Sequence, residues 1–286
     1  MTKTQYLTAY VGQFTRWLQS LSPEKPVGIT TLSRKLYPML PDFEGIIALE
    51  DGLRMRIDTR QPPERGIFFA GDRHRAVTTA MRQHVPPGAF CMDIGANIGF
   101  YTLKLAHFAG AAGRVAAFEA NPNLIKRIQE NIALNHINTV DIVPKAVSQT
   151  EGQVQFYVAA NSELSSLDYS EHAQEHITVE AVTIDSYVTS AGWPRLDFIK
   201  LDIEGYDCPA LLGGSESLAR FQPVIVLEYQ YYSDNSAAEP AFNLLRRLGY
   251  TLQGLILRSG QRVPFDWQVP YHNDILHINV LCQPPP

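Results

Sequence analysis

From about residue 86 onward the sequence alternates short apolar segments with amphipathic ones, and this alternation restricts the possible folds more than any other feature. The short segments are typical of buried strands, and the segments between them have the spacing of helices. Strands that alternate with helices form a parallel sheet covered on both faces. The predicted fold class is therefore α/β. The predicted strands lie at residues 90–95, 113–120, 139–147, 195–205 and 222–230, with two closing strands at 249–259 and 274–282.

Residues 1–85 are predicted to form a helical and hairpin appendage before a sheet domain of residues 86–286. Its first helix carries an apolar stripe, and Asp51-Gly52 between two strand-like runs is a hairpin signal. This stripe has two interpretations: it packs within the chain, or it forms the interface of a homo-oligomer. The stripe consists of Tyr10, Phe14, Trp17 and Leu21.

The composition restricts the kinds of binding partner and the cellular compartment that we expect. The net charge is −5, which provides no basic surface for a nucleic acid. The 3 cysteines are few and far apart, which fits a reducing compartment better than a disulfide framework. The N-terminus lacks a signal-peptide pattern, and no apolar run is long enough to span a bilayer. We therefore expect a cytoplasmic protein whose partner is a small molecule rather than a nucleic acid.

The first motif with chemical meaning is the loop DIGANIG, which follows the first strand of the sheet. Gly95 and Gly99 would allow the backbone to approach a nucleotide-like ligand at the carboxyl ends of the strands. A dinucleotide fingerprint would need glycine where Asn97 and Phe100 stand, so an NAD-linked oxidoreductase is disfavoured. The sequence also lacks the Gly-Lys-Ser/Thr of a phosphate-binding P-loop.

The second motif is Glu119, at the end of the next strand and about 20 residues after Gly99. An acidic side chain at this spacing binds ribose hydroxyls in related folds. A ligand with a ribose and no pyrophosphate is predicted, and S-adenosylmethionine meets both requirements.

The third motif is a group of charged residues around the fourth strand. Alternation places Lys200 and Asp202 on the same side of that strand, and a neighbouring fifth strand would bring Glu228 close to them. Lys200 could instead form a purely structural ion pair with Glu228, and Glu204 could cap the following helix. We predict catalytic roles for Asp202, Lys200, Glu204 and Glu228.

The segments DIGANIGFYT, FEANP and IKLDIEGYDCPALLGG, with Ser165-Ser166-Leu167, resemble the FkbM family of S-adenosylmethionine-dependent methyltransferases. The resemblance covers roughly residues 86–230 and implies a class I, Rossmann-like methyltransferase fold with a mixed seven-stranded sheet. It also implies methyl transfer, usually to a hydroxyl of a sugar, polyketide or other natural-product scaffold.

The resemblance further assigns residues to the cofactor. The methionine and ribose side would be lined by Asp93, Gly95, Asn97 and Gly99, with Asp202 also bordering the cofactor. Glu119 would bind the ribose diol, and Ala146 and Val147 would border the adenine. The segment FFAGDRHR lacks a glutamate expected before the first strand in many members.

Several alternatives stay open at this stage. A nitrogen acceptor, or a protein that binds the cofactor without turnover, would leave the same sequence pattern. A divalent cation on Asp202, Glu204 and Glu228 is disfavoured because Lys200 lies within the same group, so no metal site is predicted. His272 is a further candidate for the general base.

Overall fold

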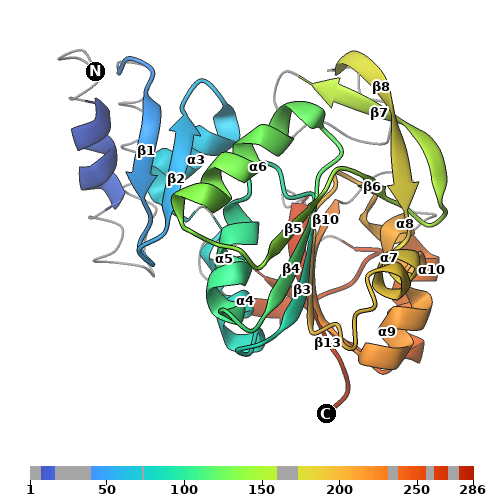
Figure 1. Cartoon of the computed structure of the whole chain (residues 1–286). Coiled ribbons are helices and arrows are strands. Elements are labelled where there is room, and N and C mark those ends of the chain that lie inside the picture. The colour runs from blue at the N-terminus through green and yellow to red at the C-terminus, as the bar shows by residue number, and fades with distance from the viewer. Residues whose placement is uncertain are drawn as a thin grey trace.

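The fold is seen in a computed structural model, which describes residues 8–16, 40–72, 74–159, 173–230, 238–255, 261–269 and 277–286. Trp17, Leu21, the segment Ser165-Ser166-Leu167 and His272 lie outside these residues. Figure 1 shows the whole chain, with the N-terminal part at one side of a large central sheet.

The central sheet has eight strands in the order β12-β11-β13-β10-β9-β3-β4-β5. Neighbours from β10 to β5 are parallel, whereas β13 runs antiparallel to both β10 and β11. The predicted mixed α/β sheet is confirmed, and β12 is an eighth strand beyond the seven expected. The strands are β3 (Phe90–Ile94), β4 (Arg114–Phe118), β5 (Val140–Val143), β9 (Phe198–Leu201), β10 (Val224–Gln230), β11 (Thr251–Leu255), β12 (Arg262–Pro264) and β13 (His277–Gln283).

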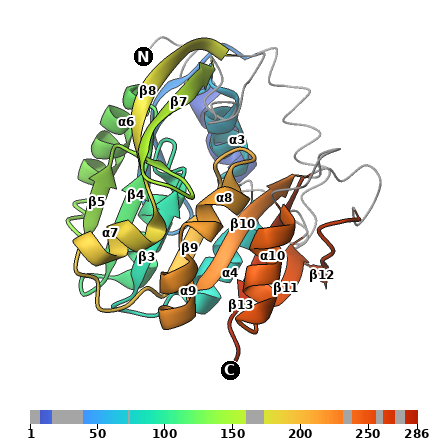
Figure 2. The same cartoon turned by 90° about the vertical axis from the view of Figure 1, so that its right-hand side faces the viewer.

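Helices cover both faces of this sheet. One face carries α4 (Arg75–His84), α5 (Phe100–Ala109) and α6 (Pro122–Leu134), and the other carries α7 (Ile184–Ser190), α8 (Asp207–Leu212), α9 (Ser215–Phe221) and α10 (Ala238–Arg247). Figure 2 shows the second group in front of the sheet. The predicted start of α6 is confirmed, because the Asn121 side chain accepts a hydrogen bond from the Asn123 amide.

The predicted third strand is divided in the structure. Pro144 has no N–H to donate, and the main-sheet strand β5 ends just before it, at Val143. Ala146–Val147 form β6, which pairs with β8 (Ala173–Val182) in a separate three-stranded sheet that also contains β7 (Gly152–Ala159). The expectation of one strand over 139–147 was therefore wrong.

The N-terminal part contains a helix at 8–16, the strands β1 (Glu44–Ala48) and β2 (Arg54–Asp58), and α3 (Pro62–Ala70). The strands form the predicted antiparallel hairpin. Tyr10 and Phe14 are 70% and 47% exposed, so these two members of the aromatic stripe face away from the core. The buried side chains of the hairpin and α3 instead pack against α5, through Phe100 and Leu103.

Polar contacts also join the hairpin to α6. Asn135 exchanges two hydrogen bonds with the backbone of Arg54, and Asn131 accepts one from the Arg56 amide. The N-terminal part is thereby attached to the helices next to the glycine loop. Within the residues that the structure describes, no helix is both long and apolar enough to cross a membrane.

Candidate active site

The glycine loop joins β3 to α5 and lies against the carboxyl end of β9. Gly95, Asn97 and Gly99 all have positive φ values, of 86°, 51° and 88°. A Cβ atom on Gly95 would lie 1.9 Å from the backbone oxygen of Asp202, so this position requires glycine. The close approach brings two of the predicted motifs, the loop and the residue after β9, into direct contact.

Asp93 lies on β3 immediately below the loop and is 1% exposed. Its Oδ2 accepts a hydrogen bond from the Thr102 hydroxyl at 2.5 Å, whereas Oδ1 is buried without a hydrogen-bond partner among the described residues. Burial raises the pKa of Asp93 to about 6. A buried acceptor atom that the chain leaves unpaired fits a ligand that brings its own donor.

Glu119 follows β4 and accepts backbone hydrogen bonds from two different loops. Its Oε2 accepts from the Asn97 amide and its Oε1 from the Asn121 amide, both at 2.8 Å. Burial nevertheless raises the pKa of Glu119 to about 7. The side chain thus connects the glycine loop to the start of α6, and it holds its proton up to nearly neutral pH.

Ala146 and Val147 lie on β6, beyond the carboxyl end of β5. Both are buried, and Val147 belongs to the same apolar cluster as Phe118, the last residue of β4. The structure therefore places them near the end of β4, where the Phe118 carbonyl accepts hydrogen bonds from the Gly95 and Ala96 amides of the glycine loop.

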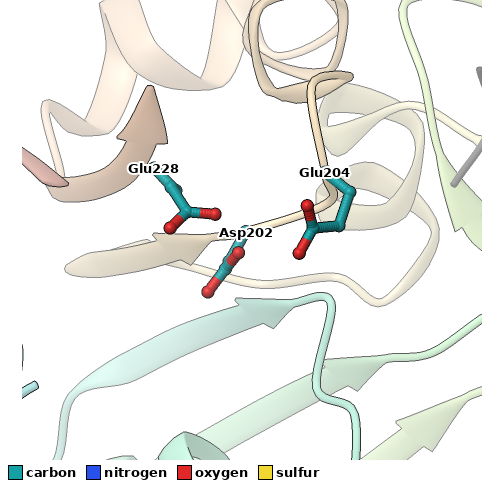
Figure 3. A group of neighbouring side chains, drawn as sticks. All are labelled: Asp202, Glu204 and Glu228. Carbon is teal, nitrogen blue, oxygen red and sulfur yellow. The ribbon is translucent and has the colours of Figure 1, made fainter. Parts of the chain in front are cut away.

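Four charged side chains gather where β9 and β10 run side by side. Lys200 is completely buried, and its Nζ donates to Asp202 Oδ2 at 2.8 Å. Asp202, Glu204 and Glu228 point toward one another in Figure 3, and one carboxylate oxygen of each lies within 4.8 Å of one from each of the other two. Glu204 accepts a hydrogen bond from Gln230 at 3.0 Å. Sequence reasoning thus correctly anticipated that these residues meet.

The same contacts bear on two of the alternative interpretations. The hydrogen-bonded ion pair of Lys200 is with Asp202, two residues along the chain, whereas Glu228 acts on Lys200 only through its charge. The N-cap of α8 is Tyr206, so Glu204 does not occupy the capping position.

The charges within this cluster are unequal. Burial opposes ionisation of Asp202, but the Lys200 charge and hydrogen bond outweigh it and hold the pKa of Asp202 below its ordinary value. The negative charge of Asp202, together with burial, raises the pKa of Glu228 to about 10. Near neutral pH, Asp202 is therefore ionised and Glu228 carries a proton.

Three carboxylates at this separation suit a hard divalent cation, which prefers oxygen ligands. The Lys200 ammonium already neutralises one of them from within the cluster. Metal-free use of the cluster therefore stays our prediction.

Sequence reasoning missed two residues beside the cluster. Tyr101, on the first turn of α5, places its ring 5.0 Å from Lys200 Nζ. His74 comes from the N-terminal part, and its Nδ1 lies 3.1 Å from the Tyr101 hydroxyl. His74 belongs to the segment FFAGDRHR, for which the sequence indicated only that a glutamate is missing.

The part of the chain that contains these motifs is similar in sequence to known proteins. The model of the methyltransferase FkbM domain matches residues 93–252, which include the glycine loop, Glu119 and the charged cluster. The chain is similar to the 2-O-methyltransferase NoeI of Sinorhizobium fredii, with 22% identity over 74% of this chain and 93% of that protein.

Two more similarities are weaker or shorter. The hexuronic acid methyltransferase AglP of Haloferax volcanii is 28% identical over 47% of this chain, and the match spans about half (53%) of AglP. A solved methyltransferase FkbM from Methylobacillus flagellatus superposes with a TM-score of 0.45 and 13% identity, over 76% of this chain and 52% of that one. The family model covers more than half of the sequence, and the chain therefore belongs to the FkbM family of S-adenosylmethionine-dependent methyltransferases.

Proposed function

We propose that this protein transfers a methyl group from S-adenosylmethionine to a hydroxyl group of a sugar or another natural-product scaffold. The observation that carries the proposal is the position of Asp202, whose carboxylate accepts a hydrogen bond from buried Lys200 and whose backbone lies directly against the glycine loop. The names of two relatives support an oxygen acceptor on a carbohydrate, because one is a 2-O-methyltransferase and the other a hexuronic acid methyltransferase. The net charge of −5 favours a small acceptor over a nucleic acid.

The glycine-loop side offers groups that suit the cofactor. In our proposal, Gly95, Asn97 and Gly99 provide the close backbone approach, and the unpaired Oδ1 of Asp93 accepts a hydrogen bond from the cofactor's amino group. Glu119 accepts from the ribose hydroxyls, and its two backbone bonds fix its orientation. Ala146 and Val147 supply apolar contacts to the adenine from β6.

S-adenosylmethionine, when bound, supplies an electrophilic methyl group. The protein must align the acceptor oxygen with that group and remove the hydroxyl proton. We assign proton removal to Asp202, because Lys200 keeps it ionised and it is 27% exposed on its side chain. Lys200 is fully buried and paired with Asp202, so we assign it an orienting role and not that of the base.

The two glutamates complete the acceptor side. Glu228 holds a proton near neutral pH, so it can donate a hydrogen bond to Asp202 and limit repulsion between the two carboxyl groups. Glu204, positioned by Gln230, accepts a hydrogen bond from a second hydroxyl of the acceptor. A polyhydroxylated acceptor would satisfy both carboxylates, which is why we favour a sugar. We divide the N-terminal part from the sheet domain at residue 85. Its hairpin and α3 would cover this side, whereas its last helix, α4, packs on the sheet.

The proposal has two competitors, an N-methyltransferase and a protein that binds the cofactor without turnover. The first measurement is calorimetric titration with S-adenosylmethionine, S-adenosylhomocysteine and NAD. We expect both sulfur ligands to bind and NAD not to bind. Tight binding of NAD with no response to the sulfur ligands would refute the cofactor assignment.

The second measurement uses S-adenosylmethionine with a carbon-13 methyl group and a panel of sugars, uronic acids and amines. The methyl carbon shift in the product distinguishes an ether from an amine. A methylated amine would establish the first competitor, and cofactor binding without any product would favour the second.

A further inference from the structure

His74, from the N-terminal part, approaches the charged cluster by way of Tyr101. His74 immediately precedes α4, and its backbone amide donates to Asp72 Oδ1 at 3.0 Å. The half-buried His74 ring places Nδ1 3.1 Å from the Tyr101 hydroxyl. This contact joins the start of α4 to the first turn of α5.

Tyr101 in turn faces the buried lysine of the cluster. Its ring centroid lies 5.0 Å from Lys200 Nζ, within the range of a cation–π interaction. A lysine ammonium has three N–H donors. For Lys200, one donor is directed to Asp202 at 2.8 Å, and the Leu201 carbonyl lies 3.4 Å away. The Tyr101 ring adds a directional attraction to these two contacts and to the charges of Glu228 and Asp93, which also act on the ammonium group.

Ion pairs join the hairpin and α3, which precede His74 in the chain, to α5 and α6. Lys104 on α5 forms an ion pair of 2.5 Å with Asp51 of the hairpin, and both side chains are buried. Glu64 on α3 pairs with Arg127 on α6 at 2.8 Å. These bonds fix the hairpin and α3 to α5 and α6, and the His74 amide is tied to Asp72, which follows α3 closely in the chain.

We propose that His74 is a positioning residue that holds the Tyr101 ring against Lys200 and thereby orients the ion pair between Lys200 and Asp202. The inference rests on the proposed function, because it assumes that Asp202 receives the acceptor proton. The charge of His74 also acts on Asp202 and lowers its pKa, which agrees with this proximity. The N-terminal part would then contribute to catalysis as well as to packing.

The kinetic test uses four variants. His74→Ala and Tyr101→Phe each remove the contact between the two side chains. The double variant removes the same contact, so it should lose nothing beyond what either single variant loses. We expect each single variant to lower kcat by about tenfold, within the range that small misplacements cost, while the Kd for S-adenosylhomocysteine stays within about twofold. The double variant should be no slower than either single variant. His74→Asn, whose amide can replace Nδ1, should restore most of kcat.

The matched control is His107→Ala, which removes an exposed imidazole from the same helix as Tyr101. It should leave kcat unchanged. Additive losses in the double variant, or equal losses in His74→Ala and His74→Asn, would overturn the positioning role.

A readout independent of methyl transfer separates this inference from the proposed function. An aromatic ring shifts the NMR signals of nearby groups, so the ε-methylene of Lys200 should have a shifted resonance in carbon-13-lysine-labelled protein. Tyr101→Leu should abolish the shift, and Lys200→Met assigns it. We expect His74→Ala to move this resonance toward its position in Tyr101→Leu. If it stays at the parental position, the inference fails. If no acceptor is methylated by the parent protein, the proposed function fails, and the resonance still decides the role of His74.

Discussion

The buried carboxyl group of Glu119 predicts that the affinity for the cofactor depends on pH. Burial raises its pKa to about 7 in the protein without cofactor, from an ordinary value of 4.5. Ribose hydroxyls that donate to the carboxylate favour its ionised form, so binding must displace the proton wherever Glu119 is protonated. The affinity should therefore fall as the pH falls below about 7.

The size of the effect follows from the same pKa. A pH of about 5.5 is about 1.5 units below the pKa of Glu119. Binding at this pH should therefore be about thirtyfold weaker than at about pH 8.5, which corresponds to about 2 kcal/mol of binding free energy. Glu119→Gln cannot ionise, so it should lack this component. At about pH 8.5 it should bind about 1 to 3 kcal/mol more weakly than the parent, the range for a lost charge-assisted hydrogen bond. The two proteins should bind almost equally at the lower pH.

The assay is calorimetric titration with S-adenosylhomocysteine across this pH range. Titration of the ligand's own amino group, and of Asp93, whose pKa is about 6, occurs with both proteins and cancels in the comparison. Gln can accept only one of the two backbone bonds from Asn97 and Asn121, so thermal melts must show that the variant is folded. An affinity of the parent that is constant over the range, or a variant that follows the parent's slope, would refute the reasoning.

The same pKa shift predicts a stability change of fixed sign. The folded-state pKa of Glu119 exceeds its ordinary value, so its contribution to stability is present below about pH 4.5 and is lost as the pH rises through about 7. The loss is about 3 kcal/mol in unfolding free energy. Glu119→Gln should not show this component in denaturant titrations at the two ends of the range.

Three further predictions concern the loop and the cluster. Asp202→Asn should lose methyl transfer by a factor of about a hundred or more, with a smaller effect on S-adenosylhomocysteine affinity; full turnover in this variant would make Asp202 structural. Gly95→Ala would place a Cβ atom 1.9 Å from the Asp202 carbonyl, so it should lower Tm and abolish cofactor binding. Its control, Gly52→Ala, has a φ of 80° and open space around it, and should cost only about 1 to 2 kcal/mol of backbone strain; equal behaviour of the two variants would contradict the clash. Chelation should leave activity unchanged, whereas loss that magnesium or manganese restores would establish a metal requirement.

The parts of this protein that could be predicted from sequence depend on local rules. Strand and helix periodicities are written in consecutive residues, which is why the α/β sheet, the hairpin at Asp51-Gly52 and the start of α6 were all anticipated. The glycine loop could be recognised because glycine has no Cβ atom and readily adopts the positive φ values that Gly95 and Gly99 have in the structure. Lys200 and Asp202 share a side of the chain through strand alternation alone.

The tertiary structure decided everything that depends on partners far apart in the sequence. Ala146–Val147 could join β5 or form a separate strand, and pairing with β8 selected the second arrangement. Lys200 had two carboxylates within reach, and the packing of β9 beside β10 determined that Asp202 holds the hydrogen bond while Glu228 retains a proton. His74 became part of the site only because the N-terminal part docks on α5. Such choices depend on burial and on non-local contacts, whose energies no short segment contains.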